Sequence, residues 1–328
     1  MTLAWILGAA AAWGFTSSPS APQRDKSFGA VILETGSGAD WKYALAAIKK
    51  EVGSEFPIEE APATDPKAFQ QAIDRLTGRR VKKIVILPLE LSSYSVLMDQ
   101  VRYLLGIRKE PSSDFLLGSR PESGVGGVSA AKIKRLAIRL PAVLAGAFDD
   151  EPLIADILTS RAQALSKNPS RESLLLVAEA SSADRANSQW AGAIDGLAEK
   201  VRAKGNFAAC RVFILPQDAS QFQREKSVRE LRETAKSLRP QGAALIVVPL
   251  TLDHGEVASK IRAMLDGIFF KYDGKAVLPD PRVAGWVKLS VSKAAALPDM
   301  RSFKDDGRAI PKPLAHKMTL KSAPGATP

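Results

Sequence analysis

The sequence contains very few cysteine, histidine and aromatic residues. Cys210 is the only cysteine among 328 residues, which excludes an internal disulfide and a zinc site built from several cysteines. The histidines are His254 and His316, and His316 lies in a basic tail where we expect no role for it. Aromatic residues make up 6% and no dense block of lysine and arginine occurs, so nucleic acid is not an expected partner.

The sequence also lacks an apolar segment long enough to cross a bilayer. The apolar run at residues 3–15 has the length of a signal-peptide core, and small and polar residues follow it up to Ala21. The first basic residue is Arg24, so no positive charge precedes this run. We expect export to the periplasm, with a mature chain that begins after about Ala21. An uncleaved leader on a cytoplasmic protein is the alternative, and no other transmembrane span is expected.

The chain is rich in positive charge and has an ordinary content of apolar residues. The net charge of +11 favours anionic partners, of which a small anionic molecule is the expected one. The hydrophobic content of 45% supports sizeable cores. Since a domain usually takes about 100–200 residues, the length predicts two domains.

A strand–loop–helix unit occurs twice in the sequence. One copy starts at position 84 as Ile-Val-Ile-Leu-Pro-Leu-Glu-Leu-Ser-Ser-Tyr, and the other at position 245 as Leu-Ile-Val-Val-Pro-Leu-Thr-Leu-Asp-His-Gly. Both runs are typical of strands buried on both faces of a parallel sheet. Landmarks recur 161 residues apart, as Pro88 and Pro249 and as Gly106 and Gly267. Two equivalent loops should therefore lie at carboxyl ends of strands, where open α/β sheets bind ligands.

Strand and helix patterns alternate through both halves of the chain. We expect strands at 28–33, 56–61, 81–91 and 134–144 and again at 174–178, 211–215 and 244–252, with helices between them. Alternation of this kind predicts two similar doubly wound parallel-sheet α/β domains that face a central cleft.

The domain boundaries follow from changes in composition. We predict a signal peptide and linker at 1–26, the first domain at 27–165, the second at 166–298 and a basic disordered tail at 299–328. Residues 111–131 have no periodicity and form a candidate lid.

Several motifs carry a resemblance to a known family. They are Leu-Pro-Leu-x-Leu-Ser-Ser-x-Ser and Tyr-Leu-Leu-Gly-Ile-Arg in the first half, then Pro-Leu-Ile-Ala-Asp-Ile-Leu, Arg-Ala-Gln-Ala-Leu-Ser and Leu-Pro-Asp-Pro. Over roughly residues 28–296 the chain resembles the CbiX-type sirohydrochlorin cobaltochelatase and ferrochelatase family in its duplicated two-domain form. The resemblance implies a class II chelatase, a lyase that inserts Co²⁺ or Fe²⁺ into a polycarboxylated tetrapyrrole in cobalamin or siroheme synthesis. The metal is then a substrate or ligand, and no cofactor is bound permanently.

The family resemblance implies histidines in two strand-end loops, as metal carriers and proton acceptors. Here the first position is Thr35 in the first half and Glu179 in the second, and the next position is Tyr94. His254 lies in the corresponding loop of the second half, although the 161-residue offset matches it to Ser93. The usual catalytic histidines are therefore replaced, which leaves open whether the chain is an enzyme.

The strand ends still supply a candidate site. We predict His254 and Glu179 as catalytic residues, because an imidazole can bind a metal and accept a proton near neutral pH. We predict His254, Glu34 and Glu179 as metal ligands, a set that suits hard or borderline divalent ions. A solvated loop histidine and glutamates tolerated at exposed strand ends are the alternative. Glu90 also interrupts an apolar strand, where a carboxylate is either at the cleft or costly to bury.

Polar and aromatic residues of the same loops should contact the ligand: Thr35, Ser92, Ser93 and Tyr94. The ring of Tyr94 could form a wall that stacks on a flat macrocycle. Three hypotheses remain: a chelatase with fewer ligands, a non-catalytic protein that binds a metal or a tetrapyrrole, and a scaffold that has kept only the fold. The missing histidines favour the last two, and His254 supports the first.

Overall fold

The computed structural model describes residues 27–111, 134–149, 151–181, 184, 188–239 and 244–302. The expected signal peptide, all but the first residue of the candidate lid, and the tail beyond residue 302 with His316 lie outside these residues. Within the described part of the chain, no helix has both the length and the apolar composition that a membrane crossing requires.

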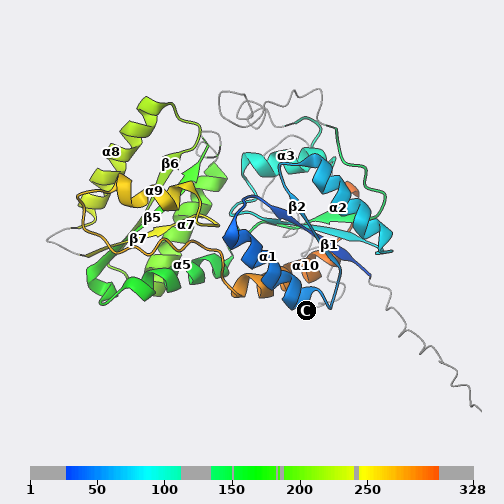
Figure 1. Cartoon of the computed structure of the whole chain (residues 1–328), viewed down its shortest axis with the longest axis horizontal. Coiled ribbons are helices and arrows are strands. Elements are labelled where there is room, and N and C mark those ends of the chain that lie inside the picture. The colour runs from blue at the N-terminus through cyan, green and yellow to red at the C-terminus, as the bar shows by residue number, and fades with distance from the viewer. Residues whose placement is uncertain are drawn as a thin grey trace, which may run out of the picture.

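The first half of the chain forms a four-stranded parallel sheet with the strand order β2-β1-β3-β4 (Figure 1). Its strands are β1 (Gly29–Glu34), β2 (Ile58–Pro62), β3 (Ile84–Leu89) and β4 (Ala142–Leu144), and its connecting helices are α1 (Ala39–Val52), α2 (Pro66–Gly78) and α3 (Val96–Leu104). Asp65 caps α2 by accepting hydrogen bonds from the next N–H groups, and Pro66 occupies the first turn, where no donor is needed.

The strand expected at 134–144 is wrong over most of its length. Only its last three residues pair with β3. The preceding backbone bonds elsewhere: the N–H of Leu136 donates to the carbonyl of Leu104, and the N–H of Ala137 donates to the Gln70 side chain. These helix contacts satisfy the backbone in place of a sheet ladder.

The second half forms a three-stranded parallel sheet with the order β6-β5-β7. Its strands are β5 (Glu172–Ala180), β6 (Ala209–Pro216) and β7 (Ala244–Pro249), and its helices include α7 (Ser188–Gly205), α8 (Gln221–Ser237) and α9 (Glu256–Met264). In both sheets the first strand of the half pairs with the second and third strands on either side. The predicted α/β class with two similar parallel sheets is confirmed.

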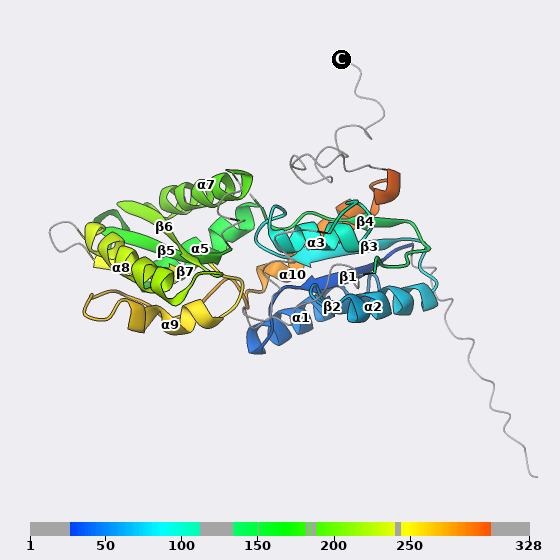
Figure 2. The same ribbon diagram turned by 90° about the horizontal axis from the view of Figure 1, so that it is seen from above.

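The sequence repeat corresponds to equivalent places in the two sheets. Pro88 of β3 lies opposite Leu33 of β1, and Pro249 of β7 lies opposite Val177 of β5. The helices that follow, α3 and α9, are both ended by a glycine with positive φ, 75° at Gly106 and 74° at Gly267. Figure 2 shows the two sheets side by side along the length of the molecule.

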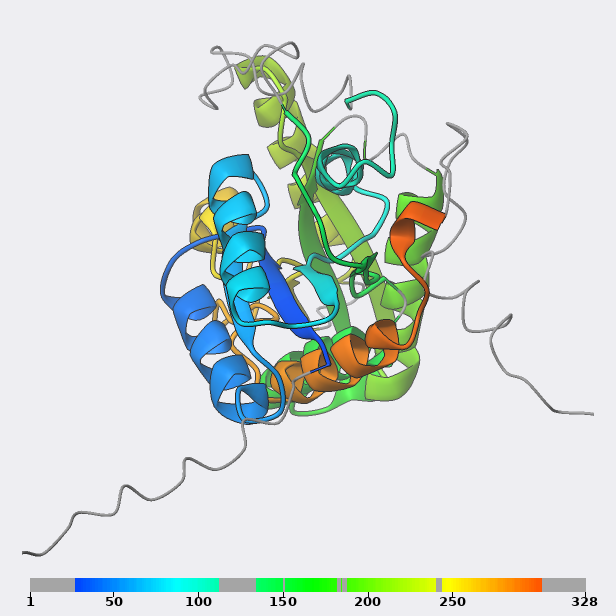
Figure 3. The ribbon, with the colours of Figure 1, turned by 90° about the vertical axis from the view of Figure 1, so that its right-hand side faces the viewer.

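Two helices pack on the sheet of the opposite half. Helix α5 (Pro152–Leu165) lies against α7 and β7, although it comes before the second sheet in sequence. Helix α10 (Arg282–Ala295), orange in Figure 3, lies against α1 and β3 of the first sheet. Because of this exchange, one hydrophobic cluster runs through both halves. The division at residues 165 and 166 stays a prediction, and the packing of α5 and α10 crosses it.

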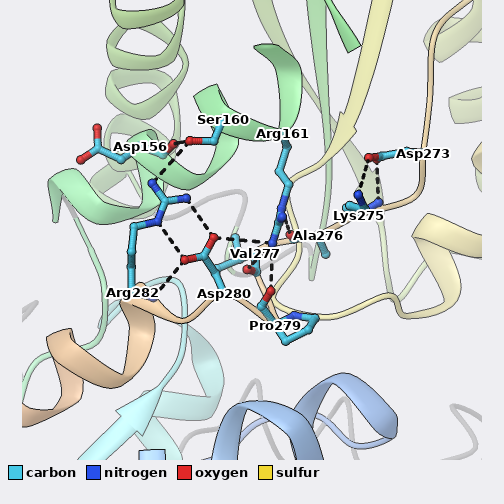
Figure 4. Close-up of polar contacts among 10 residues, drawn as sticks. All are labelled: Asp156, Ser160, Arg161, Asp273, Lys275, Ala276, Val277, Pro279, Asp280 and Arg282. Atoms are coloured by element: carbon cyan, nitrogen blue, oxygen red, sulfur yellow. Dashed lines mark hydrogen bonds and ion pairs between the residues drawn. The ribbon is translucent and has the colours of Figure 1, made fainter. Parts of the chain in front are cut away.

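The two exchanged segments are joined by polar contacts (Figure 4). Arg161 of α5 donates to the carbonyls of Ala276 at 3.1 Å and Pro279 at 3.0 Å, and it lies 3.7 Å from Asp280. Burial alone would raise the pKa of Asp280, but hydrogen bonds from Arg282 hold it below its usual value. These contacts fix where the chain passes between the halves.

Candidate functional site

The predicted site residues lie where β1, β3, β5 and β7 end. Thr35 comes two residues after the position opposite Pro88, and Glu179 comes two residues after the position opposite Pro249. Strand register therefore makes Thr35 and Glu179 equivalent, as the motifs indicated. The Thr35 hydroxyl donates to the carbonyl of Leu89 at 2.8 Å, so it ties the end of β1 to the end of β3.

The glutamates at the strand ends have different electrostatic surroundings. Desolvation and then the negative charge of Glu60 raise the pKa of Glu34, and Lys49 opposes them. Desolvation and then the charge of Glu256 raise the pKa of Glu179. Glu34 is thus influenced by α1 and β2, whereas Glu179 is influenced by α8 and α9.

The structure does not gather the predicted metal ligands into one site. Among the residues that it describes, no group of three or more histidine, cysteine, aspartate or glutamate side chains lies together as a metal-binding set would. His254, Glu34 and Glu179 therefore do not form a three-ligand set in this structure. Binding through His254 with fewer protein ligands stays a prediction.

The imidazole of His254 is oriented by the backbone. Its Nδ1 lies 2.7 Å from the carbonyl oxygen of Gly274, and because a carbonyl can only accept, Nδ1 carries the hydrogen. In the neutral ring, Nε2 then keeps its lone pair for a metal ion or a proton. A Cβ at Gly274 would lie 2.9 Å from the ring carbon Cε1, so glycine allows this close approach.

The loop that carries His254 is bound to the first half of the chain. The backbone N–H of His254 donates to Asp40 at 2.9 Å, and the buried indole of Trp41 donates to Asp253 at 2.6 Å. A Cβ at Gly36 would lie only 2.2 Å from the indole nitrogen, so this contact requires glycine there. Helix α1 thereby positions the β7–α9 loop.

Three predicted ligand-binding residues have structural contacts of their own. Ser92 and Ser93 are buried, with 1% and 2% of their surfaces exposed. The Ser93 hydroxyl donates to Asp149 at 2.6 Å, and the Ser92 hydroxyl accepts from the N–H of Tyr94 at 3.1 Å. Tyr94 is half-buried and packs on the core cluster that runs through both halves. In this structure the serines support the loop.

Glu90 and Asp184 are the acidic residues that the site predictions omitted. Burial raises the pKa of Glu90 to about 7, although the N–H of Leu91 donates to its carboxylate at 2.8 Å. Burial also raises the pKa of Asp184, which accepts a hydrogen bond from Val96 across the two halves at 2.8 Å. The interruption of an apolar strand pointed to Glu90, whereas no pattern in the sequence indicated Asp184.

No family model and no curated protein sequence matches this chain. Among solved structures, the chain is similar to SirB from Bacillus subtilis with Fe³⁺, with a TM-score of 0.57 and 12% identity over 82% of this chain and 96% of that chain. It is also similar to the sirohydrochlorin chelatase SirB from Bacillus subtilis subspecies spizizenii in complex with cobalt, with a TM-score of 0.51 and 10% identity over 82% and 95% of the chains. At these identities the likeness is one of fold: the chain has a chelatase-like α/β fold.

Proposed function

We propose that this chain is a sirohydrochlorin chelatase-like protein that inserts Co²⁺ or Fe²⁺ into a polycarboxylated tetrapyrrole at the strand ends between its halves. The observation that carries the proposal is the His254 imidazole, whose Nε2 lone pair is left available by the contact of Nδ1 with Gly274. The likeness in fold to SirB with Fe³⁺ over 82% of the chain supports a chelatase-like protein. The net charge of +11 suits a polycarboxylated partner.

The proposed reaction requires a metal carrier and acceptors for two pyrrole N–H protons. The Nε2 atom of His254 binds the incoming ion and releases it to the macrocycle. Glu179, whose pKa is raised by desolvation and by Glu256, accepts one pyrrole proton while the metal occupies the imidazole. Once the ion has passed to the macrocycle, the Nε2 atom of His254 accepts the second proton. The metal ion is a substrate of the reaction, and it leaves bound to the macrocycle.

A second candidate function is binding without catalysis. The family resemblance implies histidines at the positions held here by Thr35, Tyr94 and Glu179. None of these is an imidazole, and the Thr35 hydroxyl donates to a backbone carbonyl within the chain. The described residues also hold no three-ligand metal set. A protein of this kind would bind a metal ion or a tetrapyrrole and pass it on unchanged.

One assay separates these functions. Purified full-length protein is mixed with sirohydrochlorin and Co²⁺, and the absorbance change is compared with the spontaneous rate. A chelatase raises the rate above background, and His254→Ala removes the increase. A changed sirohydrochlorin spectrum without an increased rate supports binding alone. If neither the rate nor the spectrum changes, only the scaffold hypothesis remains.

A further inference from the structure

The chain between α9 and α10 runs beside β7 and beside the loop that follows it. We call residues 271–278 the flanking segment. At its start, the backbone of Lys271 pairs in parallel with Ile246 of β7. Near its end, the N–H of Val277 donates to the carbonyl of Thr251 at 3.1 Å. The flanking segment is therefore bonded to the β7–α9 loop, which carries the predicted metal ligand.

The middle of the flanking segment holds the imidazole of His254. The carbonyl of Gly274 accepts from Nδ1 at 2.7 Å, and the φ of Gly274 is +79°, a conformation that favours glycine. A hydrogen bond of this kind is lost when its atoms move apart by about 1 Å. The position of the flanking segment thus decides which ring nitrogen carries the hydrogen.

Arg161 of α5 anchors the end of the flanking segment, as Figure 4 shows. Its guanidinium donates to the carbonyls of Ala276 at 3.1 Å, Val277 at 3.5 Å and Pro279 at 3.0 Å. Val277 accepts from Arg161 through its carbonyl and donates to Thr251 through its N–H, so one residue joins the guanidinium to the loop. A planar guanidinium can bind several acceptors in a fixed geometry, which a lysine cannot do.

The charge of Arg161 is balanced by a buried carboxylate. Asp280 lies 3.7 Å from Arg161, and it also accepts two hydrogen bonds of 2.8 Å from the guanidinium of Arg282. If Arg161 is replaced, Asp280 therefore keeps a cationic partner. A substitution at Arg161 removes the donors to the flanking segment and leaves no buried charge without a partner.

We propose that Arg161 is a positioning residue for His254, which it holds through the flanking segment so that Nδ1 carries the hydrogen and Nε2 keeps its lone pair. Without a fixed acceptor at Nδ1, a neutral imidazole exchanges between its two tautomers, and the lone pair at Nε2 is present only part of the time. The role of His254 as metal carrier rests on the proposed function. The hydrogen bonds from Arg161 to the flanking segment and from the ring to Gly274 are present without metal.

Nitrogen NMR of the metal-free, full-length chain with labelled histidine tests the positioning. At about pH 8.5 an ordinary imidazole is neutral, and the shifts of its two nitrogens report which one carries the hydrogen. We expect the Nδ1–H tautomer for His254 in the wild type and a mixture of both tautomers in Arg161→Gln. His316 is the only other histidine, so His316→Gln assigns the signals.

Co²⁺ binding measured by titration calorimetry is the second readout. Loss of a group that orients a metal-binding histidine typically lowers affinity by about 10–100-fold, and we expect about tenfold for Arg161→Gln because Arg161 acts through the backbone. If Arg161→Gln does not fold, Arg161→Lys takes its place. It keeps the charge beside Asp280 but not the planar set of donors, so an intermediate mixture of tautomers is expected.

Arg301→Gln is the matched control. The guanidinium of Arg301 likewise donates to backbone carbonyls, those of Ile138 and Leu140 at 3.4 Å, but these belong to the first half of the chain. Its His254 tautomer and its Co²⁺ affinity should equal those of the wild type.

Two results would overturn the positioning role: mixed His254 tautomers in the wild type, or a wild-type tautomer in the folded Arg161 variant. A failure of the proposed function is recognisable separately. If the wild type binds no Co²⁺ while Arg161→Gln still mixes the tautomers, the proposed function is wrong and the positioning of the ring by Arg161 stands.

Discussion

At the scale of single residues, metal affinity should depend on His254. It offers an oriented imidazole nitrogen with a free lone pair, which borderline ions such as Co²⁺ prefer over lone carboxylates. We expect His254→Ala to lose most of the Co²⁺ affinity and Glu179→Gln to lose less, as measured by titration calorimetry. Equal Co²⁺ affinity in the wild type and in His254→Ala would show that His254 is not a metal ligand.

A second residue-scale prediction concerns stability. Glu172 is 3% exposed at the start of β5 and pairs with Lys271 at 2.5 Å. Burial alone would raise the pKa of Glu172, but the hydrogen bonds from Lys271, Ser166 and neighbouring N–H groups lower it to about 2. Glu172→Gln leaves the lysine unpaired, so we expect it to lower the free energy of unfolding by about 3 kcal/mol at neutral pH.

Urea unfolding measures the effect of Glu172→Gln and its pH dependence. Since the pKa is lowered in the folded state, the stabilisation is present above pH 4.5 and is lost as pH falls towards about 2. The difference between wild type and variant should therefore shrink in acid. Glu199→Gln is the control: its pair with Arg202 is exposed and screened by solvent, so the free energy of unfolding of this variant should stay close to that of the wild type. A constant difference at all pH values would contradict the assignment.

At the scale of elements, the close approach of Gly36 to α1 gives a test. Gly36→Ala should push the Trp41 indole away from Asp253, because the added carbon would lie 2.2 Å from the indole nitrogen. We expect a loss of about 1–3 kcal/mol of unfolding free energy and faster amide exchange in the β7–α9 loop. Gly192→Ala inside α7 meets open space, so it should be neutral or stabilise the chain by up to about 1 kcal/mol. Equal effects of the two substitutions would argue against the Trp41–Asp253 contact.

Some of these elements could be predicted from the sequence and others could not. Strands β3 and β7 were predictable, because a continuous apolar run is required of a strand buried on both faces. The equivalence of Thr35 and Glu179 was also predictable, from the loop positions that the family resemblance implies. The segment before β4 was not, since its backbone bonds to the end of α3 and to a side chain of α2.

Other features could not be predicted from the sequence because they depend on contacts between segments that are far apart along the chain. The apolar pattern of α5 suits either sheet, so the sequence does not say on which sheet it packs. The Asp184 carboxylate accepts a hydrogen bond from the N–H of Val96, 88 residues earlier in the chain, and no local sequence pattern predicts that contact. The different charges that act on Glu34 and Glu179 likewise depend on which segments cover each strand end.

At the scale of the whole molecule, the exchange of α5 and α10 predicts how fragments behave. A fragment of residues 27–165 lacks α10 and carries α5 without the sheet that buries its apolar face. We expect it to aggregate or to lack cooperative unfolding. A chain in which residues 27–149 are joined to 281–302 should fold more stably and unfold cooperatively, because α10 then covers β3 and α1. Circular dichroism and denaturant titration of both fragments check this, and a stable 27–165 fragment would contradict it.

The exchanged helices also set the order in which the chain can finish folding during synthesis. Strands β1–β3 are made before the second sheet, but the helix that covers the α1 face of the first sheet is made only after all strands of the second. At about 5–20 residues per second, the apolar side chains of β3 that face α10 stay uncovered for on the order of ten seconds in every new molecule. The growing chain should therefore be a client of ribosome-associated chaperones, even though its finished form buries these side chains completely.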